Sequence, residues 1–227
     1  MNRISKKKII IIGGKGSAVV IAEQIFDTQE HDGSVEFLGF AFDDPAFYPE
    51  INGFPILGNT YNNYEKYEKY DDVGFIFALY RPDLVKERIA LRDSYGIPLE
   101  RFANFAHHSA YIARSVEMGF GNVILANSVI NPNVKMGNYN TVQSNVLIGH
   151  DNHIGSSNFF TGHCAIGSNN TIGDGCFFGL NTSLNNYITI GNFAFCGMAS
   201  NVIKSVPDDV MVYGNPAKPV ERRIKPL

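Results

Sequence analysis

Apolar residues recur at every sixth position of residues 112–207, and no insertion breaks the phase. The next residue is usually Gly, and two positions before the apolar residue stands a small, short polar or β-branched side chain. A period of six drifts around an α-helix of about 3.6 residues per turn, and simple strand alternation does not explain the recurring Gly. The pattern is typical of a parallel β-helix of hexapeptide repeats. Its apolar positions are Ile112, Met118, Ile124, Ile130, Met136, Val142, Ile148, Ile154, Phe160, Ile166, Ile172, Phe178, Leu184, Ile190, Cys196 and Val202.

Each group of six predicts one short strand and one corner, and three groups complete a triangular coil whose apolar positions point inward. We expect Gly after the apolar residue because the backbone turns tightly there and a side chain would crowd the neighbouring coil. Asn tolerates left-handed backbone conformations, which suits it to the remaining corner positions. A β-sandwich with accidental periodicity is the alternative. The corner Asn residues include Asn127, Asn133, Asn145, Asn169 and Asn181.

The chain before the repeat alternates buried strand patterns with helical ones, which predicts a parallel sheet with right-handed crossovers. We therefore predict an α/β domain over residues 1–106, Rossmann-like in its βαβ order, followed by an all-β domain over 107–227. The stretch 61–72 is expected to be a solvated helix or loop. The expected strands are 8–12, 35–42, 73–79 and, as shorter segments, 55–58 and 102–105, and the expected helices are 18–27 and 82–95.

The net charge and the cysteines limit the partners and the compartment that we expect for the protein. The net charge of −3 over 227 residues gives no sign of nucleic-acid or membrane-surface binding. The three cysteines, Cys164, Cys176 and Cys196, lie at inward positions without Cys-x-x-Cys spacing, so we expect free thiols in a reducing cytoplasm. The apolar run after Lys8 is too short for a signal peptide, and no segment is long enough to span a bilayer.

A glycine turn follows the first predicted strand. Gly13, Gly14, Lys15 and Gly16 stand between that strand and a helix, where backbone N–H groups and the helix start favour a phosphate. Asp43 and Asp44 end the second strand, where such folds bind a ribose or a base. The dinucleotide fingerprint is incomplete, because Val19 stands where a third Gly is expected. A nucleotide site and a merely structural tight turn both fit.

Histidines interrupt the polar corners of the repeat. His150 projects from a corner beside Asp151, and an adjacent carboxylate can hold an imidazole in one tautomer as a general base, although a solvated corner is the alternative. We expect His153 to be structural and His163 either to reach a ligand or to cap a turn. A metal site formed by these three histidines, as in hexapeptide-repeat carbonic anhydrases, is a further alternative. His107 and His108, just before the first regular six, are expected to lie on the surface.

The whole chain resembles the bacterial left-handed β-helix nucleotide-sugar N-acetyltransferases, which include the bacillosamine and perosamine enzymes and the sialic-acid O-acetyltransferase-like group. The resemblance rests on the glycine turn, the Asp43-Asp44 pair, the Gly149-His150-Asp151 corner and the tail. The tail is its most specific part, because Gly-Asn-Pro-Ala-Lys closes many hexapeptide acyltransferases. Its residues are Gly214, Asn215, Pro216, Ala217 and Lys218.

The resemblance implies a left-handed β-helix, a homotrimer and acetyl-CoA bound between neighbouring β-helices, with no metal. His150 would be the base and Asp151 its orienting partner, and the backbone N–H near Ser168 would meet the thioester oxygen. Phe159 stands where relatives often carry a second His, and Ser168 where several carry Gly. The substrate contacts would be Gly13, Gly14, Lys15, Gly16, Asp43, Asp44 and Gln143, and the acetyl-CoA contacts Phe159, His163, Ser168, Gly179, Gly197 and Gly214 to Lys218.

The predicted activity is acetyl transfer from acetyl-CoA to the amine of a nucleotide-linked amino sugar, in cytoplasmic synthesis of a bacterial surface glycan such as lipopolysaccharide or capsule. A UDP-linked 4-amino-4,6-dideoxy sugar is the expected acceptor by resemblance. O-acetylation of a sugar hydroxyl is one alternative, and a non-catalytic nucleotide-sugar-binding β-helix is another. We expect direct attack without an acyl-enzyme, because no cysteine looks exposed.

Overall fold

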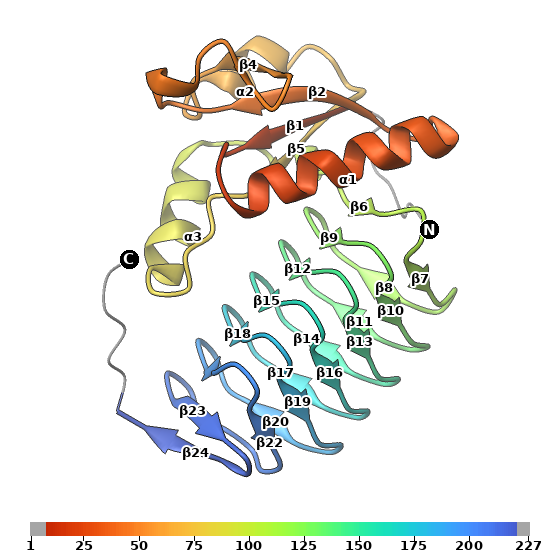
Figure 1. The fold of residues 1–227 in the computed structure, drawn as a ribbon, viewed down its shortest axis with the longest axis vertical. Helices are drawn as coiled ribbons and strands as arrows, with labels where there is room; N and C mark the ends of the chain where they lie inside the picture. Colours follow the sequence, from red (N-terminus) through yellow and green to blue (C-terminus); the bar gives the residue numbers. More distant parts are fainter. Residues whose placement is uncertain (1–7, 222–227) are drawn as a thin grey trace. The chain divides into compact units, whose positions relative to one another are not determined.

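The structure is a computed structural model that describes residues 8–221 (Figure 1). The chain divides into two compact units, with the division between His108 and Ser109. The first unit mixes helices with a mainly parallel sheet, and the second is built from short parallel strands.

The sheet of the first unit has the strand order β3-β4-β2-β1-β5. The central strand β1 (Lys8–Ile12) pairs in parallel with β2 and with β5, and helix α1 connects β1 to β2. Strand β2 pairs in parallel with β4, and β3 and β4 form an antiparallel pair at the edge. The other elements are α1 (Ser17–Asp32), β2 (Glu36–Ala41), β3 (Glu50–Ile51), β4 (Phe54–Gly58), α2 (Asn63–Tyr67), β5 (Val73–Phe77), α3 (Val85–Ser94) and β6 (Phe105–Ala106), with 3-10 turns at Pro45–Phe47 and Leu99–Arg101.

Two helix boundaries differ from the predicted ones. Helix α1 continues beyond residue 27 to Asp32, where Gly33 takes the left-handed conformation (φ 65°) that ends many helices. Helix α3 begins at Val85 rather than at Pro82, because residues 82–84 form a turn. The predicted loop or helix at 61–72 contains the short helix α2, in which Asn63 is fully buried.

The second unit is a three-sided parallel β-helix, as the repeat predicts. From β7 to β22, strands eighteen residues apart pair in parallel along each side (Figure 1). His153 thus lies beside Thr171 and Phe159 beside Phe177, and the third side ends with the antiparallel pair β23 and β24. The first side runs β7-β10-β13-β16-β19-β22, the second β8-β11-β14-β17-β20, and the third includes β9-β12-β15-β18-β21-β23-β24. The strands are β7 (Tyr111–Ile112), β8 (Glu117–Met118), β9 (Val123–Ile124), β10 (Val129–Ile130), β11 (Lys135–Met136), β12 (Thr141–Val142), β13 (Leu147–Ile148), β14 (His153–Ile154), β15 (Phe159–Phe160), β16 (Ala165–Ile166), β17 (Thr171–Ile172), β18 (Phe177–Phe178), β19 (Ser183–Leu184), β20 (Thr189–Ile190), β21 (Phe195–Cys196), β22 (Asn201–Val202), β23 (Met211–Gly214) and β24 (Ala217–Val220).

Glycine and asparagine have separate tasks in each coil. A Cβ added at Gly155 would lie 2.7 Å from the carbonyl oxygen of Gly173 in the next coil, so close approach of the coils explains the recurring Gly. The positive φ falls instead on corner residues such as Asn133 (62°) and Asn169 (60°). The prediction that Asn accommodates left-handed corners is confirmed, whereas the tight turn expected at Gly lies at the Asn corners.

Buried asparagines two positions before the apolar residue join one coil to the next. Asn140 is fully buried, and its Nδ2 donates to the Oδ1 of Asn122 and to the carbonyl oxygen of Gly155, each at 3.0 Å. The Oδ1 of Asn140 accepts from the backbone N–H of Asn158. The short polar residues in the repeat therefore satisfy backbone groups inside the prism, where an unpaired polar group is costly.

The three cysteines are free and buried inside the prism, as expected. Burial raises the pKa of Cys164 to about 11 and that of Cys176 to about 12, and it raises the pKa of Cys196 as well. Because the thiolate is the reactive form of cysteine, these thiols are poor nucleophiles at neutral pH. None of the helices within residues 8–221 combines the length and the apolar character that a membrane span requires.

Candidate active site

His150 and Asp151 occupy a corner of the β-helix between β13 and β14. Asp151 has a φ of 57°, and this left-handed turn places the two adjacent side chains together. The Asp151 Oδ2 lies 2.6 Å from His150 Nδ1, and the Oδ1 accepts a hydrogen bond from Asn133 Nδ2 at 3.0 Å. Asn133 belongs to the preceding coil, so the carboxylate is held from two sides. The structure thus brings together the predicted pair and adds Asn133, which sequence reasoning did not identify.

An ionised carboxylate faces the Nδ1 of His150 at this corner. The hydrogen bond with His150 and, secondly, that from Asn133 lower the pKa of Asp151 below its usual value of 3.8. The carboxylate therefore stays ionised at neutral pH, and its hydrogen bonds are lost only as the pH falls through the lowered pKa. An ionised acceptor at Nδ1 keeps the proton there and leaves the Nε2 lone pair to act as a base. The two side chains are 57% and 44% exposed, so a substrate can reach them.

Ser168 lies one coil below His150, but its backbone N–H is already engaged. It donates to Asn186 Oδ1 at 2.7 Å. The N–H groups of Ser156 and Asp174 likewise each donate to the side chain of the residue eighteen positions later. In this structure the bond to Asn186 uses that donor, and the contact of the Ser168 N–H with the thioester oxygen stays a prediction. The sequence contains the eighteen-residue spacing of these hydrogen bonds, so it could have predicted them.

The predicted residues of the acetyl-CoA path lie on other parts of the β-helix. Phe159 is only 6% exposed and its ring packs against Phe177 on the third sheet, with ring centroids 6.2 Å apart. His163 is an exposed corner residue with a φ of 62°. Gln143, predicted as a substrate contact, accepts a hydrogen bond from the Gly162 N–H at 3.2 Å. Within one chain, these residues do not share the corner of His150.

The tail closes the β-helix as a hairpin of β23 and β24. The Asn215-Pro216 peptide bond in the turn is cis, Gly214 has a φ of 102°, and Asn215 Oδ1 accepts from Asn201 Nδ2 at 3.3 Å. Residues 216–219, together with Val212 and the segment 202–207, line a cavity of about 410 Å³. The predicted tail residues Pro216, Ala217 and Lys218 thus border a hollow large enough for part of a ligand.

The glycines predicted beside this path are covered by the protein itself. A Cβ at Gly197 would lie 1.8 Å from the ring of Tyr213, and one at Gly179 would lie 2.5 Å from the backbone nitrogen of Met198. Both positions need Gly for packing between coils. A ligand contact is not required to explain them.

The glycine turn of the first unit leads from β1 into α1. Gly13 has a φ of 125° and Gly16 one of 56°, and a Cβ at Gly14 would collide with the ring of Phe42 at 2.6 Å. A Cβ at Gly16 would meet nothing within 4 Å. Packing therefore explains Gly14, whereas Gly16 lies in the open at the start of the helix and is required by its backbone conformation.

Two aspartates follow β2, and they differ in their partners. Asp43 accepts from the N–H and the hydroxyl of Thr60 at 3.0 and 2.7 Å, which ties it to the loop after β4. Asp44 accepts from Lys15 Nζ at 2.8 Å, and this bond, with a second from the Ala46 N–H, lowers the pKa of its carboxyl. Lys15 also lies 4.5 Å from the centroid of the Phe47 ring. Lys15, Asp44 and Phe47 therefore form a charged and aromatic surface beside the turn.

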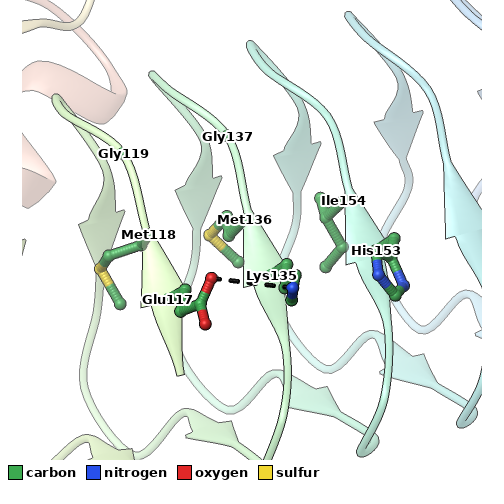
Figure 2. Close-up of a pocket in the computed structure, with 8 residues that line it drawn as sticks. All are labelled: Glu117, Met118, Gly119, Lys135, Met136, Gly137, His153 and Ile154. Carbon is green, nitrogen blue, oxygen red and sulfur yellow. Dashed lines mark ion pairs between the residues drawn. The ribbon is translucent and has the colours of Figure 1, made fainter. Parts of the chain in front are cut away.

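A second hollow of about 420 Å³ lies on the outer face of the second sheet (Figure 2). Glu117, Lys135 and His153 project outward there from β8, β11 and β14, and Lys135 Nζ lies 3.9 Å from Glu117 Oε2. His153 was expected to be structural, yet it is exposed, because it precedes the inward Ile154 and so points away from the core. The hollow is shallow and open, and its polar side chains lie side by side without converging on one point.

His150, His153 and His163 are not grouped as metal ligands within one chain. In the part of the chain that the structure describes, the one group of three or more metal-binding side chains is Asp27, His107 and His108, all in the first unit. His107, expected on the surface, is buried, because its ring bonds to Asp27 of α1.

No family model matches the chain, and no curated protein matches it by sequence. Solved structures do. The acetyltransferase domain of PglB from Neisseria gonorrhoeae is 22% identical, with 95% of this chain and 100% of that chain covered and a TM-score of 0.78. A mutant of perosamine N-acetyltransferase from Caulobacter crescentus, in complex with CoA and GDP-perosamine, is 22% identical over 96% and 99% of the two chains, with a TM-score of 0.79. WeeI from Acinetobacter baumannii is 23% identical over 93% and 99%, with a TM-score of 0.75.

The chain has the fold of these proteins. The match spans both units of the chain, so the β-helix and the preceding α/β unit occur together in these proteins as well. At 22–23% identity, the similarity to these structures establishes the fold of this chain and nothing beyond it.

Proposed function

We propose that this protein is an acetyl-CoA-dependent N-acetyltransferase that acts on the amino group of a nucleotide-linked sugar. The observation that carries the proposal is the corner formed by His150, Asp151 and Asn133, where an ionised carboxylate orients an exposed imidazole. The fold shared with perosamine N-acetyltransferase and with the PglB acetyltransferase domain supports it. The predicted division of labour assigns the nucleotide to residues 1–106 and acetyl transfer to 107–227.

The proposed reaction is a direct transfer. The amine nitrogen attacks the thioester carbonyl of acetyl-CoA, a C–N bond forms, the C–S bond breaks and the thiolate of CoA leaves. His150 Nε2 accepts the proton that the nitrogen loses and can return it to the leaving thiolate. The high pKa of the buried thiols agrees with a mechanism that uses no acyl-cysteine.

Two surfaces are the proposed ligand sites. The glycine turn, with Gly16 and Lys15 at the start of α1, would hold the phosphates of the nucleotide, and Asp44 lies where the sugar or base is expected. The hollow beside Pro216 and Lys218 would take the adenine end of CoA. A UDP-linked 4-amino-4,6-dideoxy sugar is the proposed acceptor, and cytoplasmic synthesis of a bacterial surface glycan is the proposed setting.

Release of free thiol from acetyl-CoA tests this function. The assay compares UDP-, dTDP- and GDP-linked amino sugars with their hydroxy counterparts. Release with one amino sugar establishes N-acetylation and identifies the nucleotide, whereas release only with a hydroxy sugar replaces the proposal by O-acetylation. Failure to release thiol together with failure to bind acetyl-CoA would overturn the acyltransferase assignment.

The Asp151→Asn variant is expected to lower kcat by about 10- to 100-fold. An amide keeps the shape of the carboxylate but removes the charge that stabilises the imidazolium, and a hydrogen bond to a charged group contributes about 1.5–3 kcal/mol. Measuring Tm beside kcat separates this effect from misfolding, because the variant should lose activity and keep its Tm. An unchanged kcat would argue against the orienting role.

We further propose that the β-helix is left-handed and that the protein is a homotrimer. The resemblance implies both, and the outer face of the first sheet supports association, because Tyr111 and Leu147 on that face are 57% and 44% exposed. The second sheet exposes Glu117, Lys135 and His153 instead. Exposed apolar side chains clustered on one face commonly mark a protein interface.

The Leu147→Glu variant is expected to dissociate the trimer, because a carboxylate would be buried against an apolar partner surface at a cost of several kcal/mol. Multi-angle light scattering should give the mass of a single chain for this variant. Thr171→Glu, a substitution at an exposed position of the second sheet, is the control and should keep the mass of the wild type. Equal masses for all three proteins would exclude this face as the interface.

A further inference from the structure

Asp27, His107 and His108 come together in the first unit although Asp27 is 80 residues before His107 in the chain. Asp27 lies in α1, and the two histidines follow β6 directly. The Asp27 Oδ2 lies 2.8 Å from His107 Nε2 and 3.8 Å from His108 Nδ1, and the three ligand atoms all lie within 4.8 Å of one another. Two imidazoles and a carboxylate therefore place one possible ligand atom each within the reach of a single ion.

The surroundings hold these rings in place. His107 is buried, with a side-chain exposure of 6%, and its ring lies 4.1 Å from that of His108. The ring of His31, from α1, stacks on the ring of His108, with the centroids 4.0 Å apart and an angle of 17° between the planes. Thr28 Oγ1 contacts His108 Nδ1 at 3.4 Å and accepts a bond from the His108 N–H at 3.3 Å. The His108 ring is thus fixed by contacts from the helix that carries Asp27.

We propose that Asp27, His107 and His108 form a binding site for a divalent transition-metal ion of the zinc type, separate from the acetyl-transfer corner. Imidazole nitrogen and carboxylate oxygen are ligands that Zn²⁺ prefers, at about 2.0–2.2 Å, and ligands at that distance in a tetrahedral arrangement lie roughly 3.3–3.6 Å apart. The two Asp27 distances bracket this spacing. Asp27 is 63% exposed and is free to adjust, and water would supply the fourth ligand.

Metal binding at this site would act on the fold of the first unit. The ion would replace the hydrogen bond between Asp27 and His107 by two stronger bonds and would add His108 to the same centre, so α1 would be fastened to the segment that follows β6. Binding would displace the proton that His107 and Asp27 share. The acetyl-transfer reaction proposed above uses no metal, so either proposal can fail without affecting the other.

The test uses the untagged full-length chain, treated with EDTA, desalted and titrated with Zn²⁺. Calorimetry and elemental analysis after gel filtration should give one bound ion per chain, and a 100-fold excess of Zn²⁺ over Kd should raise Tm by about 5 °C or more. In a parallel titration, Co²⁺ should show the absorption bands of a low-symmetry site, which adventitious surface binding would not produce.

Three variants show whether Zn²⁺ binds at this cluster or at another histidine. The Asp27→Asn and His108→Gln variants, both at exposed positions, should each weaken Zn²⁺ binding by tenfold or more and remove the rise in Tm. His153→Gln, an exposed histidine on the β-helix, is the matched control and should bind as the wild type does. Wild-type protein that binds no stoichiometric Zn²⁺, or variants at Asp27 and His108 that bind as tightly as the control, would overturn the proposal and leave the cluster as a buried His–Asp hydrogen bond.

Discussion

The His150→Ala variant is expected to lose about 10²–10⁴-fold in kcat, since general-base catalysis by a positioned side chain typically contributes that much. His150 is exposed at a corner and its backbone carbonyl accepts the Asn169 N–H, a bond that alanine preserves. The β-helix should therefore fold normally. The measurement is steady-state kinetics by thiol release with the acceptor found in the panel, together with Tm.

His153→Ala is the control for this prediction, because it removes an exposed imidazole three residues away on the outer face of the second sheet. We expect its kcat to stay within about twofold of wild type, because surface changes away from a site are usually neutral. A His150→Ala enzyme with near-wild-type kcat and unchanged Tm would show that His150 is not the base. Equal losses in both variants would indicate an effect of the surface rather than of one side chain.

The architecture of the second unit could be predicted because its contacts repeat every eighteen residues. An apolar residue, a Gly and a corner Asn recur in phase, and each meets its own equivalent in the next coil, as Phe159 meets Phe177. The same regularity placed His150 beside Asp151, because adjacent residues at a corner share one turn. The fold of this unit was thus determined by local patterns.

Contacts between distant segments could not be predicted in this way. The bond from Asp27 to His107 spans 80 residues and depends on how α1 packs within the first unit, which no local pattern specifies. Asp43 illustrates the same limit, because its two bonds to Thr60 join segments that no local pattern brings together. The Ser168 N–H lies between these cases: its partner Asn186 is one coil away, so the repeat contained the information, but only when read for hydrogen bonds as well as for apolar positions.

The Phe178→Ala variant is expected to lower the free energy of unfolding by about 3–5 kcal/mol. Phe178 is fully buried inside the prism, and its ring stacks on that of Phe160 with centroids 4.7 Å apart and planes 2° from parallel. Each coil is a thin layer, and its backbone is fixed on both sides by parallel pairing, as Phe178 is with Phe160 and Cys196. The coil cannot collapse around a missing ring, so the variant should keep most of the cavity and incur nearly its full cost.

Urea unfolding at a fixed protein concentration measures this effect, since association would otherwise shift the midpoint. Phe178→Leu is the matched control, because it keeps most of the apolar volume and should cost only about 1–1.5 kcal/mol. Phe177→Ala, one residue earlier on the outer face of the same strand, should also cost less than Phe178→Ala, because Phe177 is only half-buried. If Phe178→Ala were no more harmful than Phe177→Ala, the prism would be able to relax around the cavity, and the rigidity inferred from its paired coils would be wrong.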